Sequence, residues 1–344
     1  MTPASPPGPS GPSNPSGVLT ARSPEDLLAV VRVVLGFEPA DSAVMLTVGA
    51  HHPCHARIDL PDDHRDDAAL GGLAEALLRP AAGHGARSAV LVLFTEDHRL
   101  ARRASRRVSR RFEAAGVPCV EAVRAHGGRW YPLSGHRSGS GPGAVGVPYD
   151  VTAHPFVAAA VLEGRVIHGS REELAATLAT DDAAVARVQA VRRDPGAGRG
   201  DTEADTEAGA GMDAAWVSTT VAGHVAAGTL PDPPEAARLL EAIAVPAVRD
   251  AAWAGARRSQ ARRHVELWSG LVRQSPDDLL PHAAAVLAFV AWLAGDGALA
   301  WCGVDRAREE DPDHSLAGLV SELLEGVVPP DVWEQRRPYL GSAS

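Results

Sequence analysis

The stretch SAVLVLFT, Ser88 to Thr95, is an unbroken apolar run of strand length. Such a run is typical of a central strand buried on both faces, because a strand with one solvated face alternates apolar and polar residues. Helical periodicity lies on either side of it: leucines recur at helical spacing between Leu70 and Leu78, and an amphipathic segment runs from His98 to Ala115. A buried strand between two helices indicates an α/β sheet with flanking helices.

Towards the N-terminus, the sequence predicts a helix followed by a hairpin. Ser23 and Pro24 are the residue types of an N-cap and a first helical position, and Gly36 supplies the left-handed residue that ends many helices. The apolar segment 43–48 and the alternating segment 54–60 are separated by a turn, so we expect them to pair as a hairpin.

Two further short segments, 117–123 and 129–131, flank Gly127-Gly128 and predict another hairpin. The predicted order of elements is α-β-β-α-β-α-β-β. The fold class predicted for residues 18–150 is therefore an α/β domain with a mixed sheet.

From about Tyr149 the sequence changes to helical periodicity, and residues 151–340 are predicted to form an all-α helical domain. Ser170 to Glu173 has the pattern of a capping box that opens one of its helices. The Gly-rich polar segment 194–211 predicts a disordered insert, and residues 1–17 predict a disordered Pro/Ser/Gly tail. Beyond the insert the predicted helices cover about 212–227, 233–244, 246–256, 259–273, 277–294, 298–310 and 315–325.

The basic residues are all arginine, 33 in number, and the chain has no lysine. A Walker-type phosphate loop, a Schiff-base enzyme and a protein-kinase-like site each need a lysine, so these classes are excluded. The net charge of −10 argues against nucleic acid as a partner of the whole protein, because affinity for phosphates comes from clustered positive charge. The helix 99–115 nevertheless carries arginines along one face, which we interpret as a solvated face paired with nearby acids.

Cysteine usage and hydropathy predict a cytoplasmic protein. The three cysteines, Cys54, Cys119 and Cys302, are odd in number and scattered, which is typical of reduced thiols. The N-terminal tail has neither the basic residues nor the apolar run of a signal peptide. The most apolar stretch, Ala283 to Ala294, has twelve residues, whereas a bilayer crossing needs about 20, so we expect a buried helix and no membrane partner.

Two apparent cofactor motifs do not fit their chemistry, and the sequence predicts no metal and no cofactor. Cys54 and His55 in the cluster His51-His52-Pro53-Cys54-His55 are neighbours on a strand, so their side chains point to opposite faces and do not close on one ion. The GxGxxG match from Gly141 to Gly146 neither follows a strand nor opens a helix, as a dinucleotide site requires.

A candidate binding edge follows from the rule that ligands gather at the carboxyl ends of parallel strands. If segments 43–48 and 88–95 run parallel, the polar residues at that edge are His51, His52, Glu96, Asp97 and His98. Carboxylates beside histidines suit acid-base catalysis. Asp41 and Ser42 precede their strand, so we expect them at the other end, bonded to turn amides.

Several stretches together resemble the actinobacterial domain of unknown function 4192 family. They are SPEDLLAVVRVVLGFEPADSAVMLTV (23–48), SREELAATL (170–178), AVRDAAWAG (247–255), AWLAGDGALAWCGVDRAREEDPDHSLAGLV (291–320) and PPDVW (329–333). The resemblance implies an α/β part followed by a helical part and implies no activity. Many members carry a small cysteine group after the aromatic hairpin, where this chain has Ser134, His136 and Ser138, so a metal or redox role of that group is in doubt here.

The segment from Ala291 also resembles one helix hairpin of the tetratricopeptide kind, with Asp305, Arg306 and Asp311 as its surface or salt-bridging residues. The function expected from all of this is binding of a protein or a small ligand in a regulatory role. The alternative is an enzyme with an acid-base site at the carboxyl edge of the sheet, formed by Glu96, Asp97 and His51 or His98.

Overall fold

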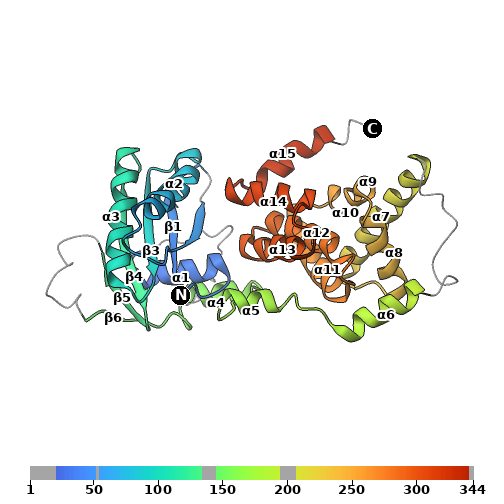
Figure 1. Ribbon diagram of the computed structural model, residues 1–344, viewed down its shortest axis with the longest axis horizontal. Coiled ribbons are helices and arrows are strands. Elements are labelled where there is room, and N and C mark those ends of the chain that lie inside the picture. Colours follow the sequence, from blue (N-terminus) through green and yellow to red (C-terminus); the bar gives the residue numbers. More distant parts are fainter. Residues whose placement is uncertain (1–20, 52–53, 134–144, 194–206, 341–344) are drawn as a thin grey trace, which may run out of the picture.

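The computed structural model describes residues 21–51, 54–133, 145–193 and 207–340. Figure 1 shows a sheet flanked by helices at one end of the molecule and a group of helices at the other. Helices α4 (Pro155–Leu162) and α5 (Arg171–Ala176) run along one side from the sheet to the helical part. The predicted fold class, a mixed α/β sheet followed by helices, is confirmed.

Six strands form one sheet in the order β2-β1-β3-β4-β5-β6. Only β3 and β4 are parallel neighbours, and every other pair is antiparallel, including both predicted hairpins. The bounds are β1 (Ser42–Val48), β2 (His55–Asp59), β3 (Ser88–Phe94), β4 (Cys119–His126), β5 (Arg129–Pro132) and β6 (Val147–Pro148).

The central strand β3 is buried on both faces, as its apolar run predicts. Leu91 and Leu93 contact the core under α2 (Asp67–Gly83) and α3 (His98–Ala114), while Val90 and Val92 belong to the core on the side of α1 (Pro24–Leu35). The sheet is therefore a middle layer between α2 and α3 on one face and α1 on the other.

The first helix begins and ends as the sequence predicts. Ser23 Oγ accepts a hydrogen bond from the Asp26 amide, and the Asp26 carboxylate accepts one from the Ser23 amide, which closes a capping box. Gly36 ends the helix at φ 72°. The next residue, Phe37, forms a β-bridge with His168, so the segment between α4 and α5 is attached to the sheet part.

The helical part is organised around α12, in which thirteen of fifteen residues are buried. Helix α13 approaches it closely at Gly303, where a Cβ atom would lie 3.0 Å from the Ala284 carbonyl oxygen. Among the described residues, no helix has both the length and the apolar character of a bilayer crossing. The bounds are α6 (Asp182–Arg193), α7 (Glu207–Ala227), α8 (Pro233–Ile243), α9 (Pro246–Arg249), α10 (Ala251–Ala254), the 3-10 helix η2 (Arg258–Gln260), α11 (Ala261–Gln274), α12 (Leu280–Ala294), α13 (Gly297–Glu310), α14 (Ser315–Glu325) and α15 (Asp331–Leu340).

The structure corrects the predicted elements in two places. Helix α7 begins at Glu207, inside the segment predicted to be a disordered insert, because Glu and Ala are strong helix formers that offset its glycines. The single helix predicted over 246–256 is two short helices, α9 and α10, each four residues long. Residues 1–17 and 194–206 lie outside the described residues.

Candidate functional site

The binding edge was predicted on the condition that β1 and β3 run parallel, and this condition is not met. Val48 pairs with Ser88 and Ser42 pairs with Phe94, so the two strands are antiparallel. The spacing of apolar residues predicts that a strand exists, but it does not determine the direction in which the strand enters the sheet.

This reversal separates the residues of the predicted binding edge. His51 follows β1 at the amino end of β3, where its amide donates a hydrogen bond to the His84 carbonyl and its ring lies against Gly85. Glu96, Asp97 and His98 follow β3 at the opposite edge. His52 lies outside the described residues. The structure therefore does not bring His51 together with the two carboxylates.

The same reversal places Asp41 and Ser42 at the carboxyl edge of β3, not at the other end as expected. Ser42 is fully buried, and its hydroxyl has no hydrogen-bond partner among the described residues. The Asp41 side chain likewise makes no hydrogen bond to a described residue, and Asp41 has a left-handed φ of 40°. The predicted bonds from these two side chains to turn amides are therefore not formed within the described part of the chain.

At this edge, Asp97 acts as the N-cap of α3. One carboxylate oxygen, Oδ1, accepts hydrogen bonds from the Arg99 and Leu100 amides at 2.7 and 3.2 Å. Burial raises the pKa of Asp97, but these bonds and the nearby His64 and His98 outweigh it, so the pKa lies below its usual value. The other oxygen, Oδ2, lies 3.7 Å from His64 Nδ1. Asp97 is therefore an ionised cap beside a histidine.

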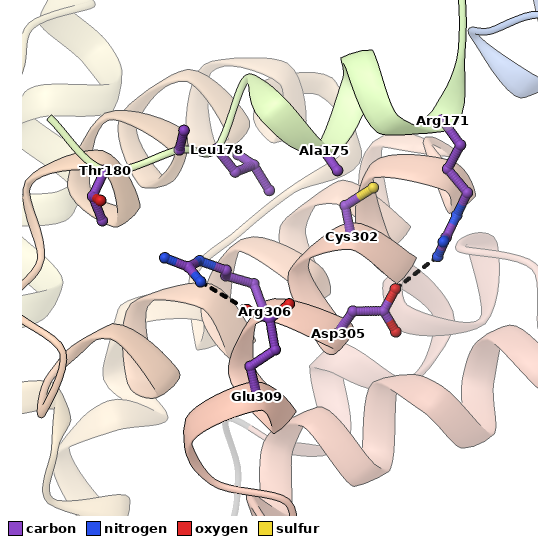
Figure 2. A pocket seen from close by; sticks show the side chains of 9 residues that line it. Arg171, Ala175, Leu178, Thr180, Cys302, Asp305, Arg306 and Glu309 are labelled. Atoms are coloured by element: carbon purple, nitrogen blue, oxygen red, sulfur yellow. Dashed lines mark hydrogen bonds and ion pairs between the residues drawn. The ribbon is translucent and has the colours of Figure 1, made fainter.

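A second group of polar residues lines a cavity of about 410 Å³ between α5 and α13. Figure 2 shows Arg171 of α5 at one end of it, the guanidinium of Arg306 of α13 reaching towards Thr180 at the other, and Cys302 between them. Its walls are formed by Arg171, Ala175, Leu178, Ala179, Thr180, Cys302, Asp305, Arg306 and Glu309.

Local sequence positions both walls. Ser170 Oγ accepts a hydrogen bond from the Glu173 amide, so α5 starts at Arg171 as predicted. The Glu173 carboxylate accepts from the Gly169 amide, one residue before the amide that a capping box would use. Asp296 caps α13 by accepting from the Leu299 amide, and the next turns of this helix present Cys302, Asp305 and Arg306 to α5. The two walls are far apart in sequence and meet only through the packing of α5 on α13.

The two guanidinium groups are held in place by carboxylates. Arg171 Nη2 lies 2.7 Å from Asp305 Oδ2, and Arg306 Nη1 lies 2.7 Å from Glu309 Oε2. The predicted role of Asp305 and Arg306 as salt-bridging residues is thus confirmed. A guanidinium has five N–H donors, and each of these ion pairs uses one of them. Donors therefore remain available at both ends of the cavity.

The middle of the cavity is apolar. Burial raises the pKa of the Cys302 thiol to about 11, so the group is protonated near neutral pH. A protonated, buried thiol behaves as a small apolar side chain and not as a nucleophile. With Ala175 and Leu178 it forms a surface suited to a short aliphatic chain.

The residues that the sequence analysis weighed as metal ligands do not gather. Cys54 is buried in the core under α2, while His55, the first residue of β2, is half-buried. In the described segments, no group of three or more His, Cys, Asp or Glu side chains is arranged to hold a metal ion. Ser134, His136 and Ser138 lie outside the described residues.

Comparison with protein families matches residues 24–331 to the family described as domain of unknown function (DUF4192). The chain belongs to this family. No curated protein and no solved structure matches the chain. The DUF4192 match spans both the sheet and the helical part, so Arg171 and Asp305 both lie within it.

The sequence signal for this cavity was weak. SREELAATL and WCGVDRAREE both belong to the stretches that carry the family resemblance, and they contribute seven of the nine lining residues. Nothing in the spacing of either stretch predicts that α5 packs on α13, because the ion pair Arg171–Asp305 spans 134 residues. Such a contact is determined by tertiary packing.

Proposed function

We propose that this DUF4192 protein is a cytosolic binding protein that takes a small carboxylate-bearing ligand between α5 and α13. The observation that carries the proposal is the pair of arginines, Arg171 and Arg306, at the two ends of one cavity with an apolar middle. Ligand sites commonly combine a mostly apolar lining with a few convergent polar groups. Arginine is the side chain best suited to bind carboxylate oxygens through two parallel hydrogen bonds.

The location of the cavity supports a regulatory role. Helix α5 follows the segment that bridges to Phe37 of the sheet part, and its Arg171 contacts α13 of the helical part. A ligand held by both walls adds contacts between α5 and α13. Binding therefore stabilises the arrangement in which the helical part is attached to the sheet part, and a partner that recognises this arrangement responds to the ligand.

Thermal unfolding with defined probes tests the proposal. Succinate, glutamate and glycylglycine are each compared with an analogue in which an amide replaces the carboxylate. A ligand at about 100 times its Kd stabilises the folded state by roughly 2.7 kcal/mol, so the carboxylate that binds raises Tm while its amide analogue does not.

Variants locate the site. Arg171→Gln and Arg306→Gln each remove a charged donor, and we expect each to weaken binding by about tenfold or more in isothermal titration calorimetry. Arg110→Gln is the matched control, because this arginine is exposed on α3, outside the cavity. Two results would exclude the cavity as the site. One is that no carboxylate probe raises Tm, and the other is that all three variants lose the same amount of binding affinity.

A second candidate function is acid-base catalysis at the carboxyl edge of β3 by Glu96, Asp97 and His98. The observation in its favour is that the His64 ring lies beside the ionised carboxylate of Asp97. The buried Ser42, at the start of β1, lies at the same edge of the sheet because it pairs with Phe94. A screen against simple esters, amides and phosphoesters tests it, with His64→Gln compared with His126→Gln. Turnover lost only in the His64 variant supports an enzyme, and the absence of turnover on every substrate class opposes it.

A further inference from the structure

The arginines of α3 form two rows with different environments. The inner arginine row, Arg103, Arg107 and Arg111, faces α2. Arg103 Nη2 lies 2.7 Å from Asp67 Oδ1, and Arg111 forms an ion pair with Glu75. These charges are matched within the protein.

The register of the inner row is regular. Its arginines recur every four residues, and the opposing α2 positions Asp67, Gly71 and Glu75 also recur every four residues. Between the two ion pairs, Arg107 Nη2 lies 3.3 Å from the position of a Cβ on Gly71. Helix α3 thus pairs with a parallel helix whose two carboxylates, on Asp67 and Glu75, lie about two turns apart on one face, because side chains four residues apart project from the same face.

The outer arginine row consists of Arg99, Arg102, Arg106 and Arg110. All four are exposed, and none forms an ion pair with another described residue. Helix α3 lies at the end of the molecule away from α11 to α14 in Figure 1, so the helical part does not cover this row. The row spans about 16 Å of the helix surface.

We propose that the outer arginine row is a docking surface for an acidic helix of a partner protein, with carboxylates about one turn apart. The charge and the spacing of the row are complementary to such a helix. The inner row and α2 already form arginine–carboxylate pairs between two neighbouring helices of this chain. Phe112 of α3 is fully buried and so does not stack on bases, and the net charge of −10 opposes the approach of a polyanionic duplex. An acidic protein segment therefore fits the row better than nucleic acid.

The test uses the full chain and a defined probe. The probe is a fluorescent alanine-rich peptide of about 20 residues with glutamate at every fourth position, and its control is the same peptide with glutamine at those positions. Fluorescence anisotropy should show binding of the glutamate peptide only. The affinity should fall steeply between about 0.05 and 0.5 M salt, because the contact is between exposed charges.

Charge-reversal variants assign the surface. Arg102→Glu, Arg106→Glu and Arg110→Glu together should weaken binding of the glutamate peptide by on the order of tenfold or more, because attraction becomes repulsion. The control carries the same charge change on exposed arginines of the helical part, as Arg187→Glu, Arg193→Glu and Arg273→Glu. Circular dichroism and Tm should show that both triple variants remain folded, since each changes exposed side chains.

Three outcomes would overturn the proposal. One is equal loss of peptide binding in the two triple variants. Another is the absence of binding at about 0.05 M salt, where surface charges are least screened. The third is tighter binding of a duplex DNA of about 20 base pairs than of the peptide, with that binding abolished by the α3 variant, which would assign the row to nucleic acid. None of these results bears on carboxylate binding at Arg171 and Arg306, so this inference and the proposed function fail separately.

Discussion

The sheet part, residues 24–148, and the helical part, residues 155–340, place their ionisable groups in different environments. In the sheet part the main ion pairs, such as Arg103 with Asp67, lie at the surface between α2 and α3. In the helical part, histidines are buried: His264 is 5% exposed and His314 is 4% exposed. Burial lowers the pKa of His55 in the sheet part to about 4 as well, but the helical part holds more such histidines and should therefore lose more stability as pH falls. The surface ion pairs should respond to salt, which screens exposed charge.

The buried histidines of the helical part are arranged as neutral rings. His314 Nδ1 accepts a hydrogen bond from the Ala317 amide as the N-cap of α14, so the proton of His314 is on Nε2. This Nε2 lies 3.1 Å from His282 Nδ1 and donates to it. Two charged groups act on this pair of rings. The positive charge of Arg249 disfavours protonation of the histidines, and the negative charge of Asp311 favours it. The hydrogen bond between the rings requires that His282 Nδ1 stays unprotonated.

The largest expected effect is a loss of stability in acid. Burial lowers the pKa of His264 to about 4 and, with the neighbouring His282 and Arg249, that of His314 to about 4. The unfolded chain binds protons at these sites from about pH 6.5 downward, so their stabilising contribution is complete above that pH and is lost as pH falls towards 4. His264 alone contributes roughly 3 kcal/mol to this change.

Urea unfolding between pH 7 and 4, followed by tryptophan fluorescence, measures this loss, since six of the seven tryptophans lie in the helical part. His264→Gln should reduce the pH dependence, whereas His98→Gln, which changes an exposed histidine of the sheet part, should not. If His264→Gln leaves the dependence of unfolding free energy on pH unchanged, His264 is not a source of the loss of stability in acid.

The next effect is steric and concerns the tight packing of the helical part. Gly303→Ala should lower the free energy of unfolding by about 1–3 kcal/mol, because its Cβ would lie 3.0 Å from the Ala284 carbonyl oxygen and from backbone and side-chain atoms of Ala288. Gly318→Ala on α14 is the control, since its Cβ meets no atom within 4 Å. Alanine has the higher helix propensity, so the control should be more stable than the original protein by up to about 1 kcal/mol. If Gly303→Ala also keeps its full free energy of unfolding, α12 and α13 pack less closely than described.

In the sheet part, the corresponding sensitive position is a turn. Gly36→Val should cost about 1–2 kcal/mol, because a β-branched residue would have to adopt φ 72°. The substitution isolates this strain, since the nearest atom to an added Cβ is 4.0 Å away. Gly36→Asn should cost less, because asparagine tolerates the left-handed region, and chemical denaturation of the two variants would measure the difference.

The same contrast explains what the sequence was able to predict. The apolar run of β3, the capping box and Gly36 of α1, and the helices α12 to α14 are encoded by neighbouring residues, and each was predicted within a few residues. The direction of β1 depends on how a long connection crosses the sheet, and this single uncertainty misplaced His51, Asp41 and Ser42. The cavity between α5 and α13 depends on an ion pair across 134 residues, so its residues were recognised as surface groups without their partners.

The smallest expected effect concerns the surface pair of Arg111 and Glu75 in the sheet part. The hydrogen bond from Arg111 lowers the pKa of Glu75, so the pair stabilises the protein above the usual glutamate pKa and loses this effect as pH falls through the lowered value. Glu75→Gln should lower Tm slightly at low salt and not at about 1 M salt, because exposed ion pairs are screened. Glu113→Gln, at an exposed α3 position, is the control and should show no salt-dependent difference. A loss that persists at high salt would mean that Glu75 stabilises α2 through packing and not through charge. The salt response of the α2–α3 surface would then rest on the pair of Arg103 and Asp67.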